Sequence, residues 1–246
     1  MKKKIALVLI GTMLATFALS ACGEKKDTAK NDAKTDDKTT FTVGFDAEYP
    51  PYGYMDENGE YTGFDLELAE AVCKLEGWEL VKKPINWDAK DMELSSGSID
   101  CIWNGFTMNG REDDYTFSTP YVDNSQVIVV AENSGINTLE DLSGKIVGVQ
   151  AASSALTLLQ SDEEDGQKAL ADTFASLNEF ADYNTAFTEL KAGALDALAI
   201  DIGVANYQLK SRGEGYKMLE ETLSTEQYAI GFKKGNQELC DIVNKD

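Results

Sequence analysis

Four polar residues stand at the carboxyl ends of predicted strands, where side chains are best placed for chemistry. Asp46 and Asn104 end two apolar runs in the first half of the chain. Gln150 and Asp201 end two similar runs in the second half. In open α/β sheets, ligands bind outside the carboxyl ends of the strands. These carboxylates and amides therefore predict the place of a ligand site.

Arg111 is the residue best suited to hold a carboxylate. The chain has 22 lysines and arginines together, of which only Arg111 and Arg212 are arginines. A guanidinium matches a carboxylate in a two-pronged geometry that an ammonium cannot copy. Arg111 follows a strand-end loop, whereas Arg212 lies at a predicted helix end and is expected in solvent. The alternative for Arg111 is a surface ion pair with the acids at 112–114.

Two serines open a helix that is predicted over residues 153–160. Because the backbone N–H groups at a helix start point outward, Ser153 and Ser154 are candidates for a second carboxylate contact. The alternative role, compatible with the first, is to cap the helix. Asp201 has a similar alternative, as the cap of a helix predicted over 203–211.

Composition excludes several classes of function. The chain of 246 residues has no histidine, which rules out catalytic triads, His-ligated zinc and imidazole proton shuttles. Its 43 acids and 22 basic residues give a formal net charge of −21, which argues against nucleic acid as a partner. With 43% hydrophobic residues and 4 prolines, we expect a folded body of one large domain or two lobes.

The first 40 residues are expected to lie outside the fold. Lysines at 2–4 precede a charge-free apolar run at 5–20, which is typical of a signal peptide. The tetrapeptide Leu-Ser-Ala-Cys resembles the bacterial lipobox, so we expect cleavage after residue 21 and lipidation of Cys22. The alternative is an ordinary secretory signal with an incidental cysteine. Residues 22–40 are polar and are predicted to form a disordered tether.

Three further cysteines remain, and an odd number cannot all pair internally. Cys73 lies in an apolar helix pattern and Cys101 in an apolar strand pattern, which favours buried thiols. A disulfide between Cys73 and Cys101 is the alternative, because the chain is expected outside the cell. Neither these two nor Cys240 has the spacing of a metal site.

The folded part alternates predicted strands and helices, which is typical of an α/β fold with largely parallel sheets. Strands are predicted at 41–46, 78–82, 99–104, 126–131, 145–150 and 195–200. Helices are predicted at 64–76, 88–96, 153–160, 184–192, 203–211 and 237–244.

A weak internal repeat predicts two similar lobes. Residues 93–104 match 189–200 in pattern: a helix end, a glycine turn and an apolar strand. Residues 42–46 match 146–150 in the same order. We expect a first lobe over 41–122, a second lobe over 123–227 and a return to the first lobe over 228–246.

Four segments, in order, resemble the motifs of one family. Residues 63–73 are similar to the signature of the family-3 extracellular solute-binding proteins, the receptors of ABC transporters for polar amino acids. Residues 46–52, 105–111 and 195–201 resemble the family's first-strand loop, its ligand loop and its second-lobe strand. The resemblance implies two Rossmann-like lobes joined by two crossing strands, the type II periplasmic-binding-protein architecture, with a cleft that closes on one amino acid.

The resemblance also implies roles for single residues. Arg111 matches the arginine that holds the ligand α-carboxylate, although its loop is one residue shorter than usual. Asp201 matches the partner of the ligand ammonium, and Thr107 should contact the same head group. Asp46 matches a position that bonds polar ligand side chains. The expected ligand-binding set is Asp46, Tyr49, Tyr52, Asn104, Gly105, Thr107, Arg111, Gln150, Ser153, Ser154 and Asp201.

Two pairs in these motifs have structural alternatives. Tyr49 and Tyr52 match aromatic positions over the ligand side chain, and their alternative is loop packing beside Pro50 and Pro51. Residues 65 and 67 are acids in a first helical turn, where carboxylates favour the positive end of the helix dipole. We expect this helix-start role for both acids, with no catalytic one.

We therefore expect a lipid-anchored, monomeric receptor on the outer face of the cell membrane. It would deliver a polar L-amino acid to an ABC transporter permease, without enzymatic activity, cofactor, metal or nucleic acid. Glutamine, cystine, basic and other polar amino acids stay open. The alternatives are a dehydratase-like enzyme that uses Asp46, Glu48 or Asp201 as general acid, and a sensor or adhesin module. Because family members continue with more helix, we expect the sequence to be truncated at Asp246.

Overall fold

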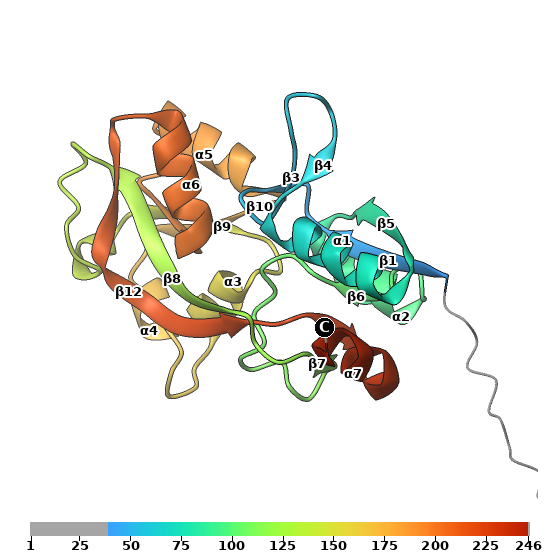
Figure 1. Ribbon diagram of the computed structural model, residues 1–246. Helices are drawn as coiled ribbons and strands as arrows, with labels where there is room; N and C mark the ends of the chain where they lie inside the picture. The colour runs from blue at the N-terminus through green and yellow to red at the C-terminus, as the bar shows by residue number, and fades with distance from the viewer. Residues whose placement is uncertain (1–38, 246) are drawn as a thin grey trace, which may run out of the picture. The chain divides into compact units, whose positions relative to one another are not determined.

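The computed structural model describes residues 39–245 (Figure 1). The predicted signal peptide, Cys22 and all but the end of the predicted tether lie outside these residues. The described part forms two five-stranded sheets and a small three-stranded sheet. No helix within residues 39–245 is both long enough and apolar enough to cross a membrane.

The first sheet, which defines the first lobe, has the strand order β5-β1-β6-β13-β7. The parallel strands β1, β5 and β6 run alongside each other, and β13 pairs antiparallel with β6 and β7. The strands are β1 (Thr40–Phe45), β5 (Glu79–Pro84), β6 (Cys101–Ile102), β7 (Tyr115–Phe117) and β13 (Gly231–Lys233). The helices are α1 (Phe64–Glu76), α2 (Lys90–Ser95) after a 3-10 turn at Trp87–Ala89, and α7 (Gln237–Lys245).

The second sheet, which defines the second lobe, has the strand order β10-β9-β11-β8-β12. Its strands are β8 (Val122–Ala131), β9 (Ile146–Gln150), β10 (Ser176–Phe180), β11 (Ala197–Asp201) and β12 (Tyr216–Tyr228). Its helices are α3 (Ser154–Gln160), α4 (Lys168–Ala171), α5 (Tyr183–Ala192) and α6 (Ile202–Arg212), with a 3-10 turn at Glu140–Leu142. The small sheet is made of β2 (Glu48–Tyr49), β3 (Gly53–Met55) and β4 (Tyr61–Thr62).

Two neighbouring segments carry the chain from one large sheet to the other. Strands β8 and β12 lie side by side in Figure 1, and Val122 pairs with Tyr228 where they meet the first lobe. The pairing continues outside the strands, because the Ser118 N–H donates to the Ile230 carbonyl over 3.0 Å. One segment leaves the first lobe and the other returns, so the two run antiparallel. The expectation of largely parallel sheets is therefore wrong: both large sheets are mixed.

The internal repeat corresponds to the same pair of contacts in both lobes: an aspartate bonded to a strand N–H, and a strand glycine packed closely against an apolar side chain. The Asp100 carboxylate accepts from the Thr42 N–H over 2.7 Å, and the Asp196 carboxylate accepts from the Ile146 N–H over 2.8 Å. A Cβ added to Gly44 of β1 would stand 2.5 Å from Ile99 Cδ1, and one added to Gly148 of β9 would stand 2.5 Å from Leu195 Cδ1. These contacts hold β1 against β6 in the first lobe and β9 against β11 in the second.

Some predicted boundaries differ from the observed ones. The strand predicted at 99–104 is regular only at Cys101–Ile102, and the chain then bends at Asn104 and Gly105, whose φ of 55° does not fit a strand. The helix predicted at 88–96 begins as the 3-10 turn and becomes α-helical only at Lys90. The long strand β12 and the small sheet are not among the predicted elements.

All three cysteines of the described part are buried in the first lobe's core, with α7 supplying Cys240.

Candidate functional site

A small cavity lies where the strand ends of the two lobes meet. Nine of the eleven predicted ligand-binding residues line it, together with Trp87, which the sequence analysis did not single out. The nine are Tyr49, Asn104, Gly105, Thr107, Arg111, Gln150, Ser153, Ser154 and Asp201. Residues at or just after strand ends of both large sheets therefore line one site, as expected for open α/β sheets.

Asp46 and Tyr52 lie beside this cavity and contact its lining. The Asp46 carboxylate accepts from Gln150 Nε2 over 2.6 Å, which joins the end of β1 in the first lobe to the end of β9 in the second. The pKa of Asp46 is raised to about 6, mainly by burial and to a lesser degree by the nearby charges of Asp182 and Glu48. The Tyr52 ring lies 5.9 Å from the Tyr49 ring, so it supports the aromatic wall of the cavity.

Arg111 lies against the first lobe with its guanidinium at the cavity. Its Nη1 donates to the Thr107 carbonyl over 3.1 Å, and its Cζ stands 4.9 Å from the centre of the Phe106 ring. Burial lowers the pKa of Arg111, and the negative charges of Glu226 and Asp201 are among those that oppose this shift. Within residues 39–245, no ion pair joins Arg111 to the acids at 112–114. The alternative of a surface ion pair there is wrong.

The two serines at the start of α3 have different partners. Ser153 caps the helix, because its Oγ accepts from the Leu156 N–H over 3.1 Å. The Ser154 hydroxyl instead donates to the Glu226 carboxylate over 2.9 Å. The capping role of Ser153 is thus confirmed, and Ser154 faces the polar side of the cavity.

Asp201 is buried in a polar cluster on the second lobe. Its Oδ1 accepts from Gln126 Nε2 over 2.6 Å, from the Tyr228 hydroxyl over 2.7 Å and from Asn124 Nδ2 over 2.8 Å. Burial raises the pKa of Asp201 to about 6, and the negative charge of Glu226 adds to the shift. Asp201 stands at the N-cap position of α6, as the alternative has it, but its side chain makes no capping bond and is engaged in the polar cluster instead.

Asp65 has a larger structural role than a helix start alone. Its side chain is fully buried, and its Oδ2 accepts from the Gly105 N–H over 2.6 Å. Burial raises the pKa of Asp65 to about 7. Gly105 is held where a Cβ would stand 2.9 Å from Tyr228, so Asp65 positions the glycine that forms part of the cavity wall.

Sequence reasoning missed Glu226, which is central to the polar cluster. Its carboxylate accepts from the Thr107 hydroxyl over 2.8 Å and from the Ser154 hydroxyl over 2.9 Å. It lies near the end of β12, and β-bulges between Met218 and Ser224 break the alternation that would have marked a buried position. The many polar residues of this strand hide it further.

Lys90 was missed as well, and it bridges the lobes. Its Nζ donates to the Ala152 carbonyl of the second lobe over 3.1 Å and lies 5.2 Å from the centre of the Trp87 ring. Burial lowers the pKa of Lys90 to about 8, and the positive charge of Arg111 contributes. A lysine at the start of a short helix carries no sequence signal for such burial.

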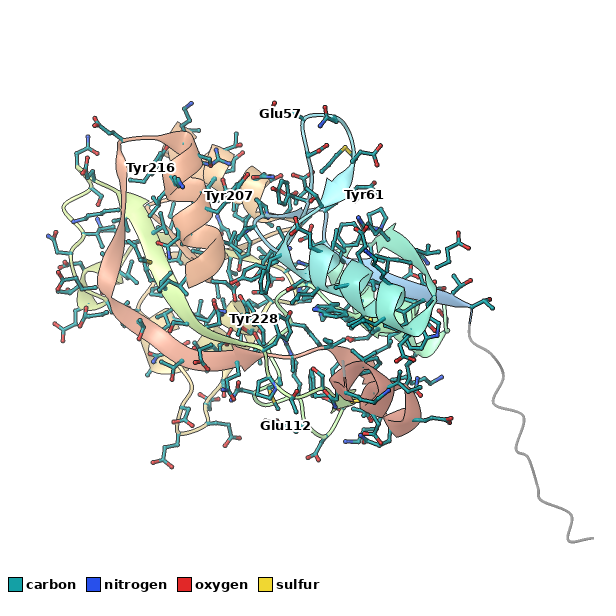
Figure 2. All side chains as sticks on the ribbon, viewed as in Figure 1. Glu57, Tyr61, Glu112, Tyr207, Tyr216 and Tyr228 are labelled. Atoms are coloured by element: carbon teal, nitrogen blue, oxygen red, sulfur yellow. The ribbon has the colours of Figure 1, made fainter. Side chains whose placement is uncertain are left out.

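Direct contacts close the two lobes on each other around the cavity. Besides the bonds of Asp46 and Lys90, Thr107 of the first lobe donates to Glu226, and Asn184 donates to Glu48. Figure 2 shows Tyr228 between the two lobes, where β12 approaches the first sheet. Within residues 39–245, no group of three or more Cys, Asp or Glu side chains is arranged to hold a metal ion.

Comparison with known proteins identifies the architecture. Residues 41–246 match the model of the bacterial extracellular solute-binding proteins, family 3. The chain is 31% identical over 247 residues to the arginine-binding extracellular protein ArtP of Bacillus subtilis, which covers 99% of this chain and 91% of that protein. It is 30% identical over 214 residues to the L-cystine-binding protein TcyJ of Escherichia coli K12, or 86% of this chain and 77% of that protein.

A solved structure shows the same two-lobe fold. It is the substrate-binding protein of an ABC uptake transporter from Streptococcus pneumoniae with bound histidine. The TM-score is 0.79 at 36% identity, over 84% of each chain. The chain therefore belongs to family 3 of the bacterial extracellular solute-binding proteins, which are binding proteins and not enzymes.

Proposed function

We propose that this protein captures an extracellular polar L-amino acid in the cavity between its lobes and delivers it to an ABC transporter permease. The observation that carries the proposal is a pair of opposite charges at one cavity. Arg111 comes from the first lobe and Asp201 from the second, and both line the same small space. A zwitterionic head group offers the complementary pair of charges.

In this proposal Arg111 holds the α-carboxylate and Asp201 accepts from the α-ammonium. Arg111 is oriented by the Thr107 carbonyl and the Phe106 ring, which leave the other guanidinium N–H groups for a ligand. Thr107, Asn104 and the serines of α3 supply shorter polar groups around the head group. Burial strengthens each charged contact, because the effective dielectric constant inside a protein is lower than in water.

The ligand side chain would lie toward Asp46 and Gln150, between the rings of Tyr49 and Trp87. Asp46 stands with Glu48 and Asp182 along one hollow of the surface that also includes Trp87. Five acids line that hollow, and they favour a side chain that donates hydrogen bonds or carries positive charge. The named ligands of the similar proteins, arginine, histidine and cystine, all carry polar groups beyond the head group.

We also propose that Cys22 anchors the protein to the outer face of the cell membrane. The support is the Leu-Ser-Ala-Cys tetrapeptide after an apolar run, followed by a polar stretch that fits a tether. Two or three acyl chains hold a protein stably at a bilayer, whereas one does not.

We place the lobes at 41–122 and 123–227, with 228–246 returning to the first lobe.

A thermal-shift screen tests the proposed function. The full chain is melted with each of the twenty amino acids and with cystine. A ligand that binds only the folded state adds about 2.7 kcal/mol of stability at 100 times Kd. We expect polar amino acids, with arginine, histidine, cystine and glutamine foremost, to raise the melting temperature. A flat screen would contradict the proposal.

A further inference from the structure

We propose that Glu226 is a second ligand-binding carboxylate, which holds the ammonium group of the bound amino acid together with Asp201. This inference rests on the proposed function of the same cavity and adds a residue to it. Glu226 stands on β12, one of the two strands that connect the lobes, and only 9% of it is exposed.

The two carboxylates are close enough to share hydrogen-bond donors. Asn124 Nδ2 donates to Asp201 over 2.8 Å and to Glu226 over 2.7 Å. Gln126 Nε2 donates to Asp201 over 2.6 Å and to Glu226 over 2.8 Å. A buried pair of like charges is unfavourable unless a positive group lies near. Arg111 is near enough for both charges to act on it, but within residues 39–245 no ion pair joins it to either carboxylate.

The cluster also contains more acceptors than donors. Asn124 Oδ1 and Gln126 Oε1 are buried and have no hydrogen-bond partner among the described residues. Exchanging the oxygen and nitrogen of either amide would not help, because the oxygen would then face the carboxylates. An ammonium brings three donors, one positive charge and no acceptor, which is the complement of this surplus.

Glu226 is connected to the cavity through groups that line it. Thr107 and Ser154 both line the cavity and both donate to the Glu226 carboxylate. Tyr228, two residues further along, lies between the lobes in Figure 2 and donates to Asp201. The ammonium of a ligand that enters this cavity would thus meet Asp201 directly and Glu226 beside Thr107. The site would select α-amino acids with a primary, unmethylated ammonium.

The test compares two ligands and three substitutions on the full chain. One ligand is the amino acid that raises the melting temperature most in the screen. The other is the same molecule without its α-amino group; for arginine this is 5-guanidinopentanoic acid. Glu226→Gln removes the charge and keeps the shape, Glu226→Asp keeps the charge, and Glu220→Gln is the control at an exposed position of the same strand. Calorimetry and competition give the dissociation constants.

We expect Glu226→Gln to weaken binding of the amino acid about 10- to 100-fold, the range for a hydrogen bond to a charged group. Binding of the deamino analogue should change by less than about 3-fold, within the error of additivity. Glu226→Asp should lose less than Glu226→Gln, and Glu220→Gln should match the wild type. A merely structural role would weaken both ligands by the same factor.

Equal losses for the two ligands, or an unchanged affinity of Glu226→Gln for the amino acid, would overturn the inference. Either result leaves the proposed function in place, because the wild type still binds the amino acid. Failure of the wild type to bind any amino acid would instead contradict the proposed function itself. Melting curves without ligand establish that each variant is folded at the assay temperature.

Discussion

In both lobes, an aspartate accepts a hydrogen bond from the backbone of a neighbouring strand. The two lobes differ in the side chains that they bring to the cavity. In the first lobe Asp100 holds the backbone of β1, and in the second Asp196 holds the backbone of β9 in the same way. The segment after each aspartate leads to the cavity, which Gly105 lines in one lobe and Asp201 in the other. The repeat therefore determines where strand ends lie, while single residues at those ends determine what they can bind.

The difference between the lobes is one of charge. The first lobe brings Arg111 to the cavity, and the second brings Asp201, with Glu226 on the connecting strand. Equivalent positions of the repeat, Asp46 and Gln150, bond directly to each other over 2.6 Å. In the proposed function this asymmetry orients a dipolar ligand, with its carboxylate toward the first lobe and its ammonium toward the second.

The largest expected effect comes from removing the cation of the first lobe. Arg111→Ala should weaken amino-acid binding about 100- to 1,000-fold, because the ligand carboxylate would be buried without its partner. Arg111→Lys should recover only part of the loss, since an ammonium lacks the planar fork. Calorimetry measures both. Arg212→Ala, at an exposed arginine of α6, is the control and should keep wild-type affinity.

The second-largest loss of affinity should come from removing the carboxylate of the second lobe. Asp201→Asn should weaken binding about 10- to 100-fold, because the ammonium loses a charged acceptor but keeps an amide oxygen. The loss should be smaller than for Arg111→Ala if Glu226 shares the ammonium. Dissociation constants from the same calorimetry decide this. An affinity equal to that of the wild type would mean that the second lobe does not hold the ammonium.

A third prediction concerns the bond between the equivalent positions Asp46 and Gln150. Burial raises the folded-state pKa of Asp46 from 3.8 to about 6, so folding favours its protonated form. The stability from this group is fully present below about pH 3.8 and is lost as pH rises through about 6. Asp46→Asn should therefore stabilise the unliganded protein by about 1–2 kcal/mol at pH 8 and much less at pH 4. Thermal melts at the two pH values measure the stability difference between the variant and the wild type. A stability gain of the same size at both pH values would argue against a raised pKa of Asp46 in the folded state.

The smallest effects on ligand binding should come from the aspartate-to-backbone hydrogen bond that the two lobes share. Asp100→Asn and Asp196→Asn each remove one charged acceptor from a backbone N–H and should each cost about 1–2 kcal/mol of folding stability. Neither should change the ligand dissociation constant by more than about 2-fold, which is about 0.4 kcal/mol. Urea unfolding and calorimetry on the two variants provide the comparison. A large loss of affinity in only one of them would show that the two lobes do not use this hydrogen bond equally.

The sequence predicts much of this scaffold because its signals are local. Helix α1 runs over Phe64–Glu76 as expected, since its apolar spacing ends at Gly77, which takes the left-handed conformation with φ 73°. The two repeat segments likewise mark their strands. Strand β12 escapes because β-bulges interrupt its alternation, and the small sheet escapes because its strands are only two or three residues long.

The site is predictable only in part, for a different reason. Strand-end residues such as Asp201 follow from position along a strand. Glu226 and Lys90 are functional candidates only through contacts with residues far away in the chain, Thr107 and Ala152. Asp65 similarly reaches Gly105, 40 residues later. No spacing in the sequence encodes such contacts, because they depend on how the lobes meet.

In the proposed function, the first lobe holds the ligand carboxylate through Arg111. The most direct measurement compares the affinity for the preferred amino acid with that for its α-carboxamide, in the wild type and in Arg111→Ala. We predict that the wild type prefers the amino acid about 100-fold or more and that Arg111→Ala binds the two ligands within about 3-fold of each other. A preference that survives unchanged in Arg111→Ala would mean that another group holds the carboxylate, and it would contradict the account.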